Sequence, residues 1–318
     1  MQAKSSRAIL LLLCLAASAA AAERIHFLIP GGAGGGWDAT ARGVGEALAR
    51  SGIIEVASYE NLSGGGGARA LAHMIETGER QKDTLMISSS SIILRSLRKM
   101  YPQSFHELSP VASVVVDYGA FVVKNDSAYQ DWHDLIADFS RNPRRVNVAG
   151  GSSRASMDHI VAALAFKKSG VDARQLKYIP YNAGGHAMVG LLSGETQVLS
   201  TGLSEAIALA DQGEVRVLAI TAPQRLDRYP GAATLTEQGV PVVFANWRGF
   251  FAAPGTSAER LREFQALLEA MFATTEWGII RDNRGWTDFF VVGEEFKSFL
   301  LQQEQEMSEL LRELGLLN

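Results

Sequence analysis

The chain has 318 residues, of which 47% are hydrophobic, and carries a formal net charge of −4 at pH 7. That negative balance argues against nucleic acid or an anionic membrane surface as its partner. Its single cysteine, Cys14, lies near the N-terminus, so the rest of the chain has no disulfide framework and no thiol chemistry. A chain of this length buries a sufficient core without cross-links and fits two domains.

Residues 1–22 have the layout of a secretory signal peptide. A basic start and a short apolar run, Ile9–Leu15, are followed by the alanine-rich stretch Ala16–Ala22. Such a run is too short to anchor the chain in a bilayer, and its small residues favour cleavage near Ala22. The residue before Cys14 is a leucine, which argues against lipid attachment. We therefore expect a periplasmic protein whose net charge changes from −4 to −6 when the two basic residues of this segment are removed.

After this segment, strand-like and helical patterns alternate along the chain. Short runs of apolar and β-branched residues predict strands at 25–29, 55–59, 84–88, 111–116, 120–123, 146–149, 177–180, 198–200, 215–221 and 242–244. Helical spacing of apolar residues predicts helices at 37–51, 68–76, 156–169, 186–193, 204–212, 258–274 and 294–314. The alternation indicates an α/β architecture with mostly parallel sheets.

Turns rich in glycine and serine follow several of these strands, at the point where the next helix begins. They are residues 30–36, 61–67, 88–91, 150–156, 182–185 and 201–204. In open α/β sheets, ligands bind at the carboxyl ends of strands, beside helix N-termini. We therefore expect the six turns to converge on one binding site.

The first two turns, PGGAGGG and NLSGGGG, contain far more glycine than a tight turn requires. Bare backbone at a helix N-terminus presents N–H groups to an anion, with the favourable end of the helix dipole behind them. We interpret these two turns as an anion cradle. Asp38 is expected to order the first turn, and the alternative is that it holds a water molecule against the ligand.

An alternative hypothesis is an exported enzyme with a glycine-rich cofactor loop. Residues 34–39 match the dinucleotide fingerprint G-x-G-x-x-A, and Glu60 is a candidate ribose-binding acid. The second glycine turn has no place in that scheme, and an exported protein would meet little NAD. The sequence contains no G-x-S-x-G, S-x-x-K or H-E-x-x-H motif, and its six histidines lack metal-ligand spacing. We predict no catalytic residue, no metal ligand and no cofactor.

Five stretches resemble, in order, the periplasmic solute receptors of tripartite tricarboxylate transporters. They are PGGAGGGWDATAR, NLSGGGGARALAHM, VNVAGGSSRASMDH, IPYNAGGHAMVGLLSGETQVLSTGLSE and VRVLAITAPQRLDRYPGAATLTEQGVPVVFANWRGFFAAPGTS. The resemblance extends along nearly the whole chain after the signal peptide. GGGWD and NWRGFFAAPG are most similar to members that bind citrate-like tricarboxylates.

The resemblance implies a type II periplasmic-binding-protein clamp, in which each lobe is a mostly parallel sheet flanked by helices. The first lobe would comprise residues 23–124 and 246–318, and the second residues 125–245. Strands near Phe121 and Phe250 would form the hinge. The implied function is capture of a small di- or tricarboxylate by a monomer and its delivery to the transmembrane permease. A ligand sensor for a membrane sensor kinase is the alternative within the same fold.

The resemblance also implies a set of ligand-binding residues. In this family the two glycine loops hold a carboxylate through backbone N–H groups and bound water, and hydroxyls from both lobes complete the site. Carried over, the set is Gly34, Gly35, Gly36, Trp37, Asp38, Gly64, Gly65, Gly66, Ser89, Ser90, Ser152, Ser153, Arg154, Asn182, Gly184, Gly185, Thr201 and Arg248.

Two arginines of this set carry open alternatives. Arg154 stands where small residues are expected, and it is either a surface charge or the partner of an additional ligand carboxylate. Arg248 is either a ligand contact or a pin between the lobes. Trp37 is expected to pack rather than to stack on the ligand.

Overall fold

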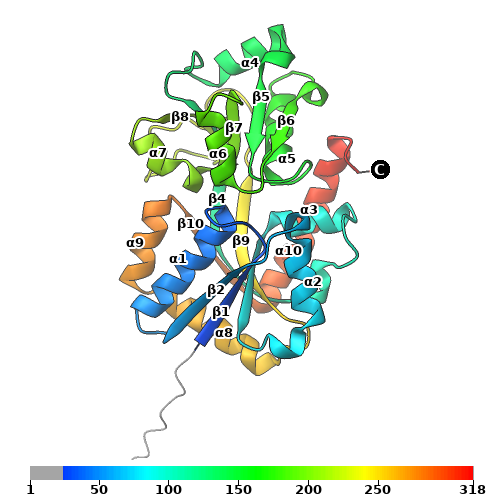
Figure 1. Ribbon diagram of the computed structural model, residues 1–318, viewed down its shortest axis with the longest axis vertical. Helices are drawn as coiled ribbons and strands as arrows, with labels where there is room; N and C mark the ends of the chain where they lie inside the picture. Colours follow the sequence, from blue (N-terminus) through cyan, green and yellow to red (C-terminus); the bar gives the residue numbers. More distant parts are fainter. Residues whose placement is uncertain (1–23, 318) are drawn as a thin grey trace, which may run out of the picture.

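The structure is a computed structural model that describes residues 24–317, so the predicted signal peptide lies outside the described residues. Figure 1 shows two lobes stacked along the long axis of the molecule, with strands β4 and β9 running between them. The strand order is β2-β1-β3-β9-β4-β7-β5-β6, and β8 and β10 both pair with β4.

The first lobe combines an N-terminal part with the C-terminal return of the chain. Its strands are β1 (Arg24–Ile29), β2 (Val56–Asn61), β3 (Thr84–Ser89), β9 (Ala245–Ala252) and β10 (Thr287–Val292). Its helices are α1 (Gly36–Arg50), α2 (Ala68–Glu76), α3 (Ser90–Leu97), α8 (Ala258–Phe272), α9 (Thr275–Arg284) and α10 (Gly293–Glu313). Strand β1 pairs in parallel with β2 and β3, so the turns after these three strands emerge at one edge of the sheet.

The second lobe repeats this arrangement. Its strands are β5 (Asn147–Gly150), β6 (Lys177–Pro180), β7 (Val198–Gly202) and β8 (Val215–Ile220), and its helices are α4 (Trp132–Arg141), α5 (Met157–Lys168), α6 (Gly184–Leu192) and α7 (Ile207–Asp211). Strand β5 pairs in parallel with β6 and β7, which directs the turns after these strands toward the first lobe.

Strand β4 (Ser109–Lys124) belongs to both sheets. Residues 109–118 pair antiparallel with β9, and residues 119–124 pair antiparallel with β7 or β8. The sheets are therefore parallel where they carry the glycine and serine turns and antiparallel where the chain crosses between the lobes. This mixed α/β arrangement confirms the predicted fold class.

The two crossing chains are tied together by Thr221. Its hydroxyl accepts a hydrogen bond from the Gly119 N–H at 2.8 Å and donates one to the Phe244 carbonyl at 2.7 Å. Its backbone bonds the same two residues. The Thr221 N–H donates to the Gly119 carbonyl, and the Thr221 carbonyl accepts from the Phe244 N–H. The buried Thr221 therefore fixes the crossover of β4 against the chain that enters β9.

Large aromatic side chains fill the core on both sides of the crossover. Phe121 packs on Trp132 in the second lobe, with ring centroids 4.5 Å apart. Trp247 packs edge-on against Phe296 in the first lobe, at 5.6 Å. These rings belong to one continuous apolar cluster, so the two lobes share a core beside the hinge strands.

The structure corrects several predicted elements. The two strands predicted at 111–116 and 120–123 are one strand, β4, because pairing continues through residues 117–119. The strand predicted at 242–244 is wrong. That segment follows Pro241 and is irregular, and β9 begins at Ala245. Helices α3, α4 and α9 and strand β10 were not predicted.

Candidate functional site

The turns predicted from the sequence lie against one another where the lobes meet. A Cβ atom built on Gly32 or Gly35 would lie 3.6 or 3.7 Å from the Cβ of Ala183, which belongs to the second lobe. The first glycine turn therefore contacts the NAGG turn at the start of α6. The lobes are closed on each other in this structure.

Asp38 orders the first glycine turn. Its carboxylate accepts hydrogen bonds from the Gly34 N–H at 3.0 Å, from Arg42 Nε at 2.9 Å and from Asn61 Nδ2 at 3.0 Å. Asn61 Nδ2 also donates to the Gly31 carbonyl at 2.9 Å. Burial alone would raise the pKa of Asp38, but these hydrogen bonds and the Arg42 charge outweigh it and lower the pKa. These contacts are those of the expected ordering role.

Helices α1, α5 and α6 begin at this interface without a side-chain cap, as does α2 after Gly67. Helices α1, α5 and α6 start after Gly35, Ser156 and Ala183, and none of these side chains accepts a hydrogen bond from its helix. Helices α4 and α8, at the two far ends of the molecule, are capped by Asp131 and Ser257. In α5 the Asp158 N–H donates to Ser152 Oγ of the preceding turn, whereas the first-turn N–H groups of α1 and α6 have no such side-chain acceptor and are the groups that can receive an anion.

Each glycine turn of the first lobe also makes room for a buried arginine. A Cβ on Gly36 would lie 2.7 Å from the Cζ of Arg248, and a Cβ on Gly66 would lie 2.6 Å from the Cζ of Arg95. Gly66 also has φ of 65°, which side-chain-bearing residues rarely adopt. The glycines of these turns therefore leave space for two guanidinium groups, in addition to exposing backbone N–H groups.

Arg248 is paired within the protein. Its guanidinium, 3% exposed, contacts the fully buried carboxylate of Asp117 on β4 and donates to Thr40 Oγ1 at 3.0 Å. The same carboxylate accepts a hydrogen bond from Ser204 Oγ of the second lobe at 2.6 Å. Arg248 and Asp117 therefore connect α1 and β4 of the first lobe to Ser204 of the second.

Two acidic residues at the interface were not predicted. Glu205 receives a hydrogen bond from the Thr201 hydroxyl, and its Cδ would lie 2.6 Å from a Cβ on Gly184. Burial raises the pKa of Glu205, and the neighbouring Asp117 adds to this rise, whereas Arg248 opposes it. Glu205 immediately follows the predicted TGLS turn, so proximity to that turn was the available signal.

The second of these acids is Asp158, in the first turn of α5. Burial, and then the nearby Glu205 carboxylate, raise the pKa of Asp158 to about 7. The Ser152 hydroxyl and the Gly151 N–H act in the opposite direction. Asp158 also lines a small cavity together with Thr201 and residues of β4.

That cavity measures about 20 Å³. A single water molecule requires about 10–15 Å³ by the same measure. The closed interface therefore has room for about one water there, so a small organic acid enters this site only when the lobes separate.

The predicted residues of the first lobe differ in their surroundings. Ser89 caps α3 and accepts a hydrogen bond from Trp37 Nε1 at 3.1 Å, so both side chains are engaged within the lobe. Ser90 is fully buried, and its hydroxyl has no hydrogen-bond partner among the described residues. Gly64 and Gly65 lie at the exposed surface of their turn.

The predicted residues of the second lobe lie on three turns. Ser152 is held near Tyr178 and accepts from the Asp158 N–H at 3.3 Å, whereas the buried hydroxyl of Ser153 has no described partner. Arg154 is exposed and forms no ion pair with the described residues. The structure also leaves Asn182 and Gly185 exposed and Gly184 and Thr201 buried.

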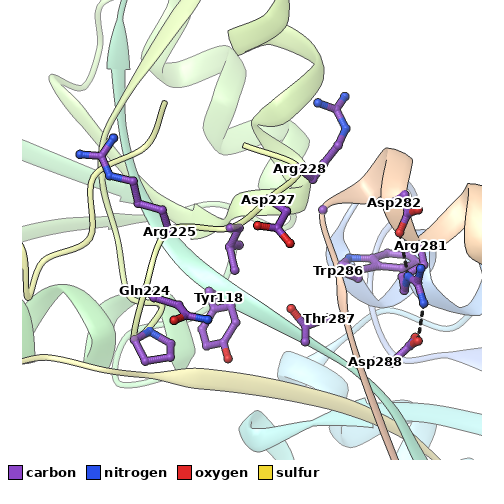
Figure 2. Close-up of a pocket in the computed structure, with 13 residues that line it drawn as sticks. Tyr118, Gln224, Arg225, Asp227, Arg228, Arg281, Asp282, Trp286, Thr287 and Asp288 are labelled. Atoms are coloured by element: carbon purple, nitrogen blue, oxygen red, sulfur yellow. Dashed lines mark hydrogen bonds and ion pairs between the residues drawn. The ribbon is translucent and has the colours of Figure 1, made fainter. Parts of the chain in front are cut away.

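A larger cavity of about 470 Å³ lies beside the hinge, lined by Tyr118, residues 223–228, residues 281–282 and residues 285–288 (Figure 2). Its arginines are already paired. Arg281 contacts Asp282 and Asp288, and Arg225 and Arg228 point away from the centre toward partners outside it. Successive side chains of a strand point to opposite faces of the sheet, so the side chains of Tyr118 and Asp117 lie on different faces of β4. None of the predicted ligand residues lines this cavity.

Two lobes that close over helix N-termini, with two strands crossing between them, define a clamp-type solute-binding protein. The family model of the tripartite tricarboxylate transporter family receptor, TctC, matches residues 39–316, and the chain belongs to this family. Receptors of this family bind small carboxylates and work with tripartite transporters. The chain is therefore a binding protein rather than an enzyme.

Individual relatives agree with this assignment. BugT of Bordetella pertussis is 26% identical over 306 residues, covering 92% of this chain and 89% of BugT. The periplasmic binding protein BugD has the same fold, with a TM-score of 0.82 at 19% identity, covering 92% of this chain and 98% of BugD. Rpa4515 of R. palustris, solved with adipate, gives a TM-score of 0.82 at 20% identity over 92% of this chain and 97% of its own.

No helix within residues 24–317 is both long and apolar enough to cross a membrane. No group of three or more His, Cys, Asp and Glu side chains in that range is arranged to hold a metal ion.

Proposed function

We propose that this protein is a periplasmic receptor that captures a small di- or tricarboxylate between its lobes and delivers it to the permease of a tripartite tricarboxylate transporter. The observation that carries the proposal is the meeting of the uncapped N-termini of α1, α5 and α6 at the lobe interface. A carboxylate placed there satisfies N–H groups that have no intrahelical partner and lies at the favourable end of each helix dipole.

The proposed lobes are residues 23–124 with 246–318, and residues 125–245, in a monomer that uses no cofactor. Binding selects the closed form from a pre-existing equilibrium, because only the closed form contacts the ligand from both lobes. The ligand enters the open form and displaces the direct contact between the first glycine turn and Ala183. Rpa4515, which has the same fold, is described with the dicarboxylate adipate.

The proposal is tested by a thermal-shift screen of the chain without residues 1–22. The panel is citrate, tricarballylate, succinate, malate, adipate and NAD, each with and without magnesium. A ligand that binds only the folded state raises the melting temperature by mass action. A shift with one of the acids supports the receptor. A shift with citrate or tricarballylate alone supports the tricarboxylate subgroup, and a shift with NAD alone contradicts the proposal.

The position of the site is tested by Gly35→Val. Gly35 has φ of −86°, which valine tolerates, and an added Cβ would meet no atom closer than 3.5 Å. The valine methyl groups would occupy the space in which a carboxylate approaches α1, so we expect binding to be lost while the fold is kept. Gly231→Val is the control, because nothing lies within 4 Å of its added Cβ. Equal affinities in the two folded variants would place the cradle elsewhere.

A further inference from the structure

Arg95, which was not among the predicted site residues, lies where four of the predicted turns meet. It belongs to α3, directly after the serine turn, and its guanidinium lies against Gly66 of the second glycine turn. The same group lies 5.7 Å from the ring of Trp37, and its Nη2 donates to Ser156 Oγ of the second lobe at 3.1 Å. Arg95 therefore reaches the lobe interface from the first lobe.

The charge of Arg95 is not compensated by the described residues. The side chain is only 3% exposed, its Nε has no hydrogen-bond partner, and its only described side-chain acceptor is the neutral hydroxyl of Ser156. A guanidinium carries five N–H donors, so most of its hydrogen-bonding capacity is unused. Arg248, which is equally buried at 3%, differs because it is paired with the Asp117 carboxylate.

A buried charge without a partner is costly, and proteins retain one where a partner is supplied. Tyr101 and Asp158 interact with Arg95 at longer range, but neither side chain is hydrogen-bonded to it or forms an ion pair with it among the described residues. The second glycine turn accommodates the guanidinium only because Gly66 has no side chain. The chain therefore keeps an unpaired cation inside the lobe interface at the expense of an unusual backbone conformation.

We propose that Arg95 binds a carboxylate of the ligand through its guanidinium fork and thereby selects ligands with at least two carboxylates. The helix N-termini hold one carboxylate, and Arg95 holds another in the bidentate geometry that a guanidinium and a carboxylate share. This inference rests on the proposed function and adds the group that distinguishes a diacid from a monoacid.

The test compares Arg95→Gln and Arg95→Lys with the wild type by isothermal titration calorimetry, using citrate, malate, adipate and the monoamide of adipate. Loss of a charge-assisted bond inside a desolvated site corresponds to about 10- to 100-fold weaker binding. We expect that loss for the diacids with Arg95→Gln and a smaller loss with Arg95→Lys. We also expect Arg95→Gln to lose the preference of the wild type for adipate over its monoamide.

Two controls separate ligand binding from a structural role. Arg98→Gln removes the cation directly after the same helix, whose guanidinium contacts Met100 Sδ at 3.6 Å and the Ala155 carbonyl at 3.5 Å, and its affinities should match the wild type. Ser156→Ala removes the described partner of Arg95. If Arg95 acted only through that interlobe contact, Ser156→Ala would reproduce the loss of diacid preference and overturn the inference.

The remaining outcomes are equally decisive. Unchanged diacid affinity and preference in Arg95→Gln overturn the inference and leave the proposed function intact. A wild type that binds none of the three acids overturns both. Arg95→Gln removes an unpaired buried charge, so we expect the unliganded variant to melt no lower than the wild type. If Arg95→Gln fails to fold, the test uses Arg95→Lys, for which we expect a reduced preference for adipate over its monoamide.

Discussion

At the scale of single residues, the most consequential contact outside the ligand turns is the Arg248–Asp117 pair. Both side chains are buried, and their partners come from α1, β4, β9 and the second lobe. A buried ion pair contributes little when compared with apolar packing, but removal of one partner leaves an uncompensated charge. The pair therefore specifies how the lobes meet more than it raises stability.

Asp117→Asn should accordingly be strongly destabilising. The amide keeps the size of the side chain but leaves the Arg248 charge without its counter-ion, which typically lowers the free energy of unfolding by about 3–5 kcal/mol. Glu46→Gln removes the carboxylate of an exposed helical pair with Arg50, where a change of about 0.5 kcal/mol or less is expected. Urea denaturation of both variants measures the difference, and similar losses would show that the Asp117 carboxylate is not needed as a counter-ion.

Sequence patterns predicted the turns that meet at the lobe interface and Arg248 beside them, but not Arg95 or the buried acids. The glycine and serine turns can be recognised from local sequence, because their composition differs from that of the neighbouring elements. The contacts of the buried arginines are long-range: Arg95 and Ser156 are 61 residues apart, and Arg248 and Asp117 are 131 apart. No local pattern signals such pairs. The glycine content of the two turns predicts exposed backbone N–H groups alone, whereas in the structure Gly36 and Gly66 also leave space for guanidinium groups.

At the scale of secondary-structure elements, the predictions were most accurate where the apolar period is regular. Helix α2 and strand β6 have the predicted bounds, whereas α9, with a run of charged residues in TEWGIIRDNR, was missed. Strand β4 appeared as two strands because Asp117-Tyr118-Gly119 resembles a turn. Pairing across this segment, together with the hydrogen bonds from Thr221, keeps the backbone extended. Tertiary contacts decide such cases, not local preference.

The Thr221 hydroxyl makes two of the four hydrogen bonds by which this residue ties the crossover together. Thr221→Val keeps the shape of the buried side chain but leaves the Gly119 N–H and the Phe244 carbonyl without the bonds they now make to it. We expect the free energy of unfolding to fall by about 1–3 kcal/mol, the cost of leaving buried polar groups unsatisfied. Denaturant titration against Thr256→Val, which loses one hydrogen bond in a partly buried loop, provides the comparison. An equal effect in the two variants would contradict a special role for the crossover.

At the scale of the whole molecule, closure of the lobes places two acids at one interface. Asp158 and Glu205 repel each other, and both have a raised pKa because burial disfavours their charged forms. Arg248 lowers both values, and Arg95 faces the same region from the first lobe. Burial at the closed interface therefore favours the protonated forms of these two acids, whereas the Arg248 charge of the first lobe favours their ionised forms.

The sign of the resulting pH dependence follows from proton uptake. Asp158 has a pKa of about 7 in the folded chain and an ordinary value of 3.8, so between those values the folded state binds a proton that the unfolded state does not. Stability must therefore fall as the pH rises through that window. Asp158→Asn removes this titrating group. We expect the melting temperature of the variant to change less than that of the wild type between about pH 5 and 8. At the upper end of this range the variant should melt at a higher temperature than the wild type.

A matched control is Asp172→Asn. Hydrogen bonds from Arg174 hold the pKa of the exposed Asp172 at about 2, so this group is ionised in both states above about pH 5. Its replacement should leave the slope between about pH 5 and 8 unchanged. If Asp158→Asn also left the slope unchanged, Asp158 would be ionised at neutral pH in the folded chain. The closed form would then carry the full negative charge of Asp158 beside the proposed ligand site, and a polycarboxylate would have to overcome it through the helix N-termini and Arg95.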